Sequence, residues 1–211
     1  MSRFLFFVLI VLIVSCKEAV QTATSLAKVP EEPVLVADQG SYFTLDKDAV
    51  SIYLPDTFEK YSISEYEYEV KKINDSIDDP FVSLFTNLRD NLKGKFYLLY
   101  DKDNYSFCAV NSIPYFDFKR QDAKYMLAMI RKNQQDASGP DLFFEKQTAK
   151  YSATDDVKIF KAVFKLSNFD ETLVNYRHIY LISTRNNQTF QFIFNTPFEA
   201  DFDPFIRRMK I

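Results

Sequence analysis

Four strand-like stretches follow one another in the C-terminal part of the chain, with only short links between them. They cover residues 142–153, 157–166, 173–184 and 189–195. The links contain turn-forming residues, which are Asp155 with Asp156, a loop over 167–171, and Asn186 with Asn187. Strands joined by such short links must pair antiparallel, because a parallel pair needs a crossover of a dozen or more residues. This region therefore predicts an antiparallel β-sheet.

Two more strand pairs are predicted earlier in the chain. Residues 42–45 and 50–54 are typical of a hairpin that Pro55 stops. Residues 96–100 and 105–110 predict a second hairpin around a turn at 101–104.

Helices are predicted where apolar residues recur at helical spacing. The first follows Ser64 as a possible N-cap and has Tyr66, Val70, Ile73 and Ile77 in register. The second begins at Asp79 and Pro80, ends at Gly94, and carries on one face Phe81, Leu84, Phe85, Leu88 and Leu92.

The third predicted helix covers residues 119–134 and has on one side Ala123, Met126, Leu127 and Ile130. A short last helix begins at Pro204, where Asp203 is the expected N-cap. Helices that cover one face of an antiparallel sheet define the α+β class, which is the fold class that we expect.

The composition agrees with one globular domain and excludes two other classes of protein. The chain has 211 residues and is 47% hydrophobic and 17% aromatic, which is too apolar for a disordered chain. Its formal net charge of -3 gives no electrostatic footprint for nucleic-acid binding, so no nucleic-acid partner is expected.

The N-terminus has the form of a secretory signal. A single Arg3 precedes an apolar run over residues 4–14, which is too short to span a bilayer as a helix. Residues 13–16, Ile-Val-Ser-Cys, resemble the bacterial lipobox, and this resemblance implies cleavage before Cys16 and acylation of its thiol. An ordinary signal peptide that happens to precede a cysteine is the alternative. Acyl chains on Cys16 would anchor the protein to a membrane.

The sequence then divides into three parts. Residues 1–15 are the predicted lipoprotein signal peptide, and residues 16–41 are the lipidated Cys16 and a flexible tether without aromatic residues. Residues 42–211 are the predicted single domain. A strand around 34–36 that pairs with the domain edge is the alternative for the tether.

Few residues offer recognisable chemistry. The single histidine, His178, shares one face of a strand with Tyr176 and Tyr180, and this face either packs against helices or lines a groove. Cys108 lies in a strand and is expected to be a buried, inert thiol. Residues 101–105 begin like a calcium loop but lack its later ligands, so a hairpin turn is expected. We therefore expect no catalytic residue, no metal and no cofactor.

Two stretches carry a family resemblance. Residues 50–58 form a strand that ends in Leu54 and Pro55, and residues 189–197 form a final strand followed by the Asp203 and Pro204 helix start. This order of elements resembles the PsbP-like α/β/α sandwich over most of residues 42–211. The resemblance implies an accessory or binding role rather than an enzyme.

The low glycine content, with three residues, and the lipobox also resemble lipoproteins of the Bacteroidota. Our hypothesis from the sequence is a membrane-anchored envelope lipoprotein that binds a partner protein or a small ligand without catalysis. The alternatives are an enzyme with a site on the Tyr176, His178 and Tyr180 face, and a structural assembly factor.

Overall fold

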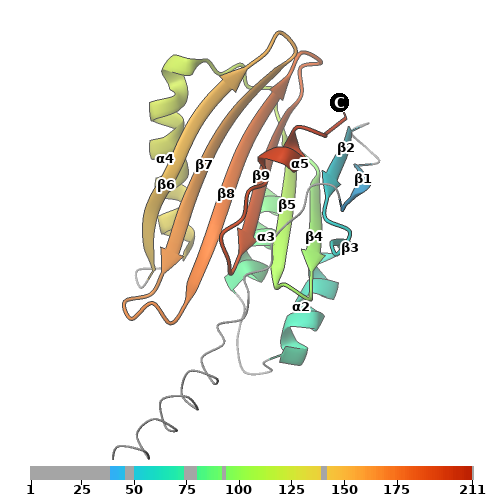
Figure 1. Ribbon diagram of the computed structural model, residues 1–211, viewed down its shortest axis with the longest axis vertical. Coiled ribbons are helices and arrows are strands. Elements are labelled where there is room, and N and C mark those ends of the chain that lie inside the picture. Colours follow the sequence, from blue (N-terminus) through green and yellow to red (C-terminus); the bar gives the residue numbers. More distant parts are fainter. Residues whose placement is uncertain (1–38, 46–49, 74–79, 92–93, 139–141, 211) are drawn as a thin grey trace, which may run out of the picture. The chain divides into compact units, whose positions relative to one another are not determined.

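A seven-stranded antiparallel sheet forms the centre of the domain in the computed structural model (Figure 1). The structure describes residues 39–45, 50–73, 80–91, 94–138 and 142–210, all within one unit that spans Val34–Ile211. The strand order is β3-β4-β5-β9-β8-β7-β6. The strands are β3 (Glu59–Tyr61), β4 (Phe96–Asp101), β5 (Ser106–Ile113), β6 (Phe143–Ala153), β7 (Val157–Ser167), β8 (Val174–Thr184) and β9 (Thr189–Thr196). The predicted antiparallel sheet is confirmed.

The four strands at the C-terminal end of the sheet are the best predicted part of the fold. Strands β6 to β9 begin and end within a residue or two of the stretches that the sequence indicates. Strands β7 and β8 stay in register from Val157 opposite Thr184 to Ser167 opposite Val174. Strands β8 and β9 meet at a tight turn in which Asn187 has a positive φ of 57°. Asparagine adopts this left-handed conformation more readily than most residues, so Asn187 suits the turn that the sequence predicts.

Three helices cover one face of this sheet (Figure 1). They are α2 (Ile63–Ile73), α3 (Pro80–Asn91) and α4 (Ala123–Ser138), and a 3₁₀ turn, η1 (Arg120–Asp122), leads into α4. The apolar faces predicted for α3 and α4 do face the sheet, since Phe85, Met126 and Ile130 are buried against it. The α+β fold class is therefore confirmed.

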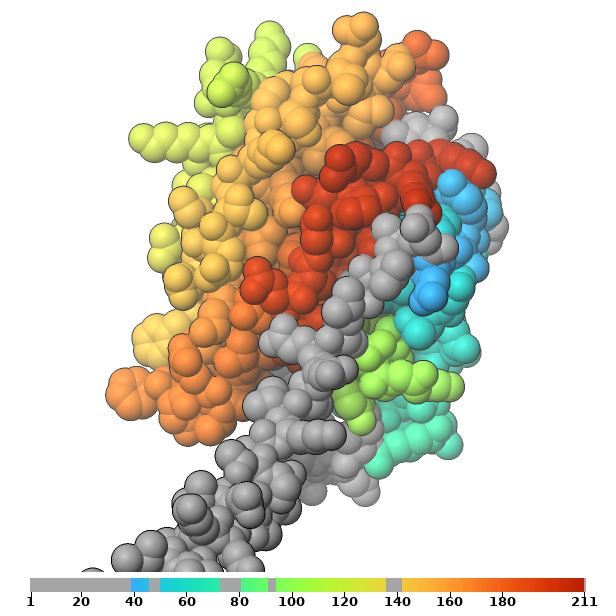
Figure 2. Space-filling model, viewed as in Figure 1, coloured from blue at the N-terminus to red at the C-terminus, as the bar shows by residue number. Residues whose placement is uncertain are grey.

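A small hairpin and the C-terminal segment cover the opposite face. The hairpin is β1 (Ser41–Leu45) with β2 (Val50–Leu54), and the C-terminal helix is α5 (Asp203–Ile206). Figure 2 shows the dark red C-terminal segment lying beside the blue hairpin. The tail continues the small sheet, because Ser51 and Lys210 each donate a backbone hydrogen bond to the other at 2.9 Å. Both faces of the central sheet are thus covered over its middle strands, whereas most residues of the edge strand β6 are exposed.

Two predicted helix caps are wrong. Ser62, not Ser64, caps α2: the backbone N–H of Glu65 donates to Ser62 Oγ at 3.2 Å, and the N–H of Ser62 donates to Glu65 Oε2 at 2.7 Å. This reciprocal pair is a capping box. Asp203 is the first residue of α5 rather than its N-cap, and its carboxylate bonds to side chains of the central sheet instead.

Asp79 lies outside the described residues, as do Cys16 and the tether up to residue 38.

Gly94 lies at a close approach between the segment after α3 and strand β5. Its φ is +142°, and a Cβ at this position would lie 1.4 Å from the carbonyl oxygen of Ser112. No side chain fits there, so only glycine permits the hydrogen bond from Ser112 N–H to the Lys95 carbonyl at 2.9 Å.

Within the described part of the chain, the helices are all too short or too polar to cross a membrane.

Candidate functional site

The predicted face of β8 lies on the side of the sheet that α5 covers. His178 packs edge-on against Phe202, and Tyr180 belongs to the core between the sheet and the β1–β2 hairpin. Arg177 and Ile179 point to the helical side, so the predicted alternation holds. Of the two alternatives for this face, packing against a helix is the one observed, and the helix is the short α5, because α2, α3 and α4 all lie on the other side.

Asp203 joins three elements at the centre of this face. Its Oδ1 accepts hydrogen bonds from the Tyr180 hydroxyl at 2.8 Å and from Lys161 Nζ at 2.7 Å. Burial tends to raise the pKa of Asp203, but the hydrogen bonds from Lys161 and Tyr180 outweigh it and lower that pKa. Burial and the neighbouring Asp203 raise the pKa of Tyr180. We call Lys161, Tyr180 and Asp203 the C-terminal lock, because they hold the start of α5 on strands β7 and β8.

His178 lies next to this lock but makes no hydrogen bond with it. The side chain is 3% exposed, and neither ring nitrogen has a hydrogen-bond partner. Its ring centroid is 5.2 Å from that of Phe202, with the planes at 82°. Burial and the charge of Lys161 lower its pKa to about 4. His178 is therefore neutral at pH 7 and lies too deep to reach the proton of a substrate, as a general base must. Tyr176 is half-buried near the start of β8.

Cys108 and the turn after β4 have the states that the sequence predicts. Cys108 is fully buried in β5, and burial raises the pKa of its thiol well above the usual value, which leaves it unreactive. Asp101 accepts hydrogen bonds from the backbone N–H groups of Asp103 and Asn104 and from the Thr57 hydroxyl. Its oxygens hold the turn together. Among the described residues, no group of three or more acidic, histidine or cysteine side chains is placed to hold a metal ion.

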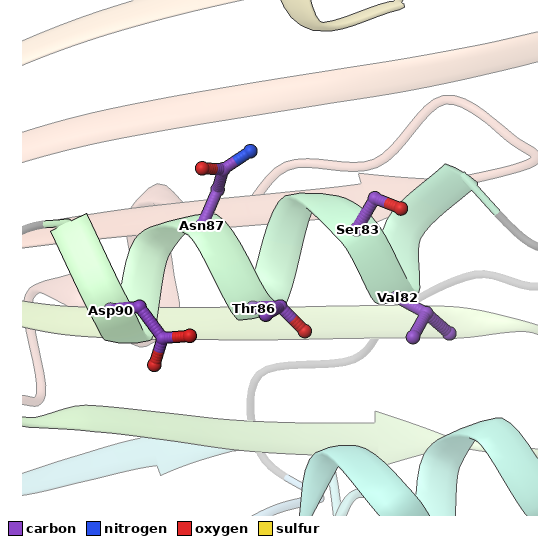
Figure 3. Close-up of a pocket in the computed structure, with 5 residues that line it drawn as sticks. All are labelled: Val82, Ser83, Thr86, Asn87 and Asp90. Carbon is purple, nitrogen blue, oxygen red and sulfur yellow. The ribbon is translucent and has the colours of Figure 1, made fainter.

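Two cavities lie away from the predicted face. The larger, of about 310 Å³, is lined by residues of α3 alone, which are Val82, Ser83, Thr86, Asn87 and Asp90. Figure 3 shows that these side chains point to different sides of the helix, so they do not converge on one point. The smaller cavity, of about 230 Å³, lies at the β7–β8 end near Asp156, Arg185 and Met209. Neither cavity includes His178.

Among the described residues, the most exposed aromatic ring belongs to the loop between β7 and β8. Phe169 is 91% exposed. Its loop is held by its own hydrogen bonds: Asn168 Nδ2 donates to Thr172 Oγ1 at 2.8 Å, and the Leu173 N–H donates to Asn168 Oδ1 at 2.9 Å. The sequence predicts this loop, but Phe169 was not among the predicted site residues. Its position between turn-forming residues could have indicated an exposed ring. We call residues 168–173 the Phe169 loop.

Comparison with known proteins gives a similarity of structure. No family model matches the chain, and no curated protein matches it. The solution structure of cyanobacterial PsbP (CyanoP) from Synechocystis sp. PCC 6803 superposes with a TM-score of 0.56 at 13% sequence identity. The match covers 89% of this chain and 99% of that one. At this identity the similarity concerns the fold, and the chain therefore has the PsbP-like α+β fold that its order of elements predicts.

Proposed function

We propose that this protein is a lipid-anchored, non-enzymatic accessory protein of the bacterial cell envelope, and that its domain binds a partner protein. The lipobox resemblance at Cys16 supports the anchor. The side chains of Lys161, Tyr180 and Asp203 bond to one another and hold α5 in place. This engagement within the domain supports a role without catalysis.

The observation that carries the binding role is the Phe169 loop. A phenyl ring that is 91% exposed stabilises nothing in the isolated domain, whereas burial of an aromatic side chain dominates many protein interfaces. The loop holds its conformation through its own hydrogen bonds, so little conformational entropy is lost when it binds. A pre-organised aromatic residue of this kind fits an apolar pocket on another protein.

Site-specific crosslinking in intact cells tests this role. Phe169 is replaced by the photoreactive amino acid p-benzoylphenylalanine, and Tyr105 is replaced in a control strain. Tyr105 is 56% exposed in the β4–β5 turn, so it reports on chance encounters. We expect one envelope protein to be crosslinked reproducibly from position 169 and not from position 105. The same adducts at both positions, or none at position 169, would contradict the proposal.

The anchor is tested separately by fractionation. The substitution Cys16→Ala should move the protein from the membrane to the soluble fraction. Cys108→Ser is the matched control, because it removes the other cysteine and leaves the lipobox intact. Membrane retention of the Cys16→Ala protein would refute the anchor while leaving the crosslinking result untouched.

An enzymatic alternative rests on Lys161, His178 and Tyr180, the titratable side chains that lie around Asp203. A cavity that joins His178 to a carboxylate would favour it, and neither of the two cavities above does so. A small ligand remains the alternative to a partner protein, but the side chains along the α3 cavity do not converge on one point and so give it little support.

A further inference from the structure

The outward face of α4 combines exposed apolar side chains with cations. Tyr125 is 67% exposed and Met129, one turn later, is 45% exposed. Lys124, Arg131 and Lys132 are exposed beside them. We call these five residues the α4 surface. Helical spacing places Lys132 near the centre of the outward face, with Tyr125 and Met129 on one side of it and Lys124 and Arg131 on the other.

The second feature of the α4 surface is the surroundings of its cations. Among the described residues, no carboxylate forms a salt bridge with Lys124, Arg131 or Lys132. The two acids that precede the helix are engaged elsewhere. Asp117 pairs with Lys158, and Asp122 accepts a hydrogen bond from the backbone N–H of Lys119.

Helix α2 shows the opposite arrangement on the same side of the sheet. Its two lysines are each paired with a glutamate: Lys71 with Glu67 at 2.8 Å, and Lys72 with Glu69 at 2.7 Å. Helix α2 also exposes a tyrosine. Tyr68 is 64% exposed, which is close to the 67% of Tyr125 on α4. The two helices therefore expose similar rings, but the part of the chain that the structure describes supplies ion-pair partners for the lysines of α2 and none for the cations of the α4 surface.

Two further exposed aromatic rings precede α4 in the chain. Tyr115 and Phe116 are about half-exposed in the loop that leads into η1. Thr189 and Ser183 hold that loop, since the Phe116 N–H donates to Thr189 Oγ1 at 2.9 Å and Ser183 Oγ donates to the Phe116 carbonyl at 2.8 Å. The rings are thus presented from a fixed loop.

We propose that the α4 surface docks on an anionic phospholipid surface, with α4 lying along the membrane plane. Helices that rest on membranes combine apolar and aromatic side chains, which enter the interface, with Lys and Arg, which attract anionic headgroups. The chain as a whole carries a net charge of -3, so this local positive surface would also orient the domain. The inference deepens the proposed function, because a lipid on Cys16 would keep the α4 surface within reach of the bilayer.

A tryptophan reporter tests the docking directly, because the chain contains no native tryptophan. Tyr125→Trp places the reporter on the α4 surface, and Tyr68→Trp is the matched control on α2. Each full-length lipidated protein is reconstituted into vesicles of phosphatidylcholine alone or mixed with phosphatidylglycerol. We expect blue-shifted emission and protection from acrylamide only for Tyr125→Trp, only with phosphatidylglycerol, and reversed by high salt.

Charge removal gives a quantitative outcome in the same assay. Each neutralised basic residue should weaken docking by about fivefold, and Lys124→Gln, Arg131→Gln and Lys132→Gln together by about 100-fold. Equal spectra for the two reporters on phosphatidylglycerol vesicles would overturn the proposal, and an acidic protein would then be the partner to seek. Loss of the Tyr68→Trp protein from floated vesicles would instead indicate that the anchor is wrong.

Discussion

Acidification should destabilise this protein through one residue, His178. The pKa of this buried imidazole is about 4, whereas a histidine in an unfolded chain has a pKa near 6.5. Between these values the unfolded chain binds a proton that the folded protein does not. Stability is therefore complete above the unfolded pKa and falls as the pH drops toward the folded pKa. The surrounding charges are Lys161 on β7, which favours the neutral ring, and Asp201 and Asp203 near α5, which oppose it.

The magnitude follows from the difference between the two pKa values. A difference of about 2.5 units corresponds to about 3 kcal/mol when the transition is complete, and about 2 kcal/mol of this is lost between pH 7 and pH 5. His178 is 3% exposed, so solvent screening does not reduce this effect. The assignment is unambiguous, because His178 is the only histidine of the chain.

Urea unfolding followed by circular dichroism measures this loss at pH 7 and pH 5. The variant His178→Leu has no ionisable ring, and it loses no hydrogen bond because neither ring nitrogen makes one. We expect its unfolding free energy to stay within about 1 kcal/mol of the wild type at pH 7. We also expect it to change little at pH 5. If the variant loses as much stability as the wild type over this range, the reasoning about His178 is refuted.

Three further predictions concern other residues. Asp203→Asn should reduce the unfolding free energy by about 1–2 kcal/mol, since the Asp203 side chain is one-third exposed, while Asp156→Asn, in an exposed pair with Arg185, should leave it unchanged. Gly94→Ala should cost about 3 kcal/mol or more in thermal or urea unfolding, because its Cβ would overlap the Ser112 carbonyl, and wild-type stability would contradict that close approach. In the membrane-extracted protein a maleimide should label no thiol when folded and one per chain in urea, because Cys108 is buried and Cys16 is acylated; a second labelled thiol would show that Cys16 is free.

The sequence predicts this fold well where local patterns are sufficient. Strands β6 to β9 combine apolar residues with turn-forming links, so their bounds and antiparallel pairing follow without tertiary information. Strand β3 was missed because it has only three residues and exists by pairing with β4. The cap of α2 was misplaced by two residues, since Ser62 and Ser64 each have a glutamate three positions later, Glu65 and Glu67, and the pattern alone does not say which serine forms the capping box.

The contacts that shape the candidate site could not be predicted from local patterns. Asp203 precedes a proline and so has the pattern of an N-cap, but its carboxylate bonds to Tyr180 and Lys161, which are 23 and 42 residues away in the chain. The alternation of β8 correctly placed Tyr180 and His178 on one face, yet gave no indication that α5 would close over them. The loop at 167–171 could be predicted from its turn-forming residues. The exposure of the Phe169 ring could not, because it depends on the packing of the whole domain.

The surfaces available for binding a partner are those that packing within the domain leaves exposed. The C-terminal lock and the β1–β2 hairpin cover part of one face of the sheet, three helices cover the other, and most residues of β6 stay exposed. Strand β6 leaves an open edge, but a register shift between Lys146 and Thr148 interrupts it, and Lys146 and Lys150 add charge. Bulges and lysines of this kind hinder pairing with a strand of another chain. A partner should therefore contact side chains rather than extend the sheet, which leaves the Phe169 loop for a protein and the α4 surface for a membrane.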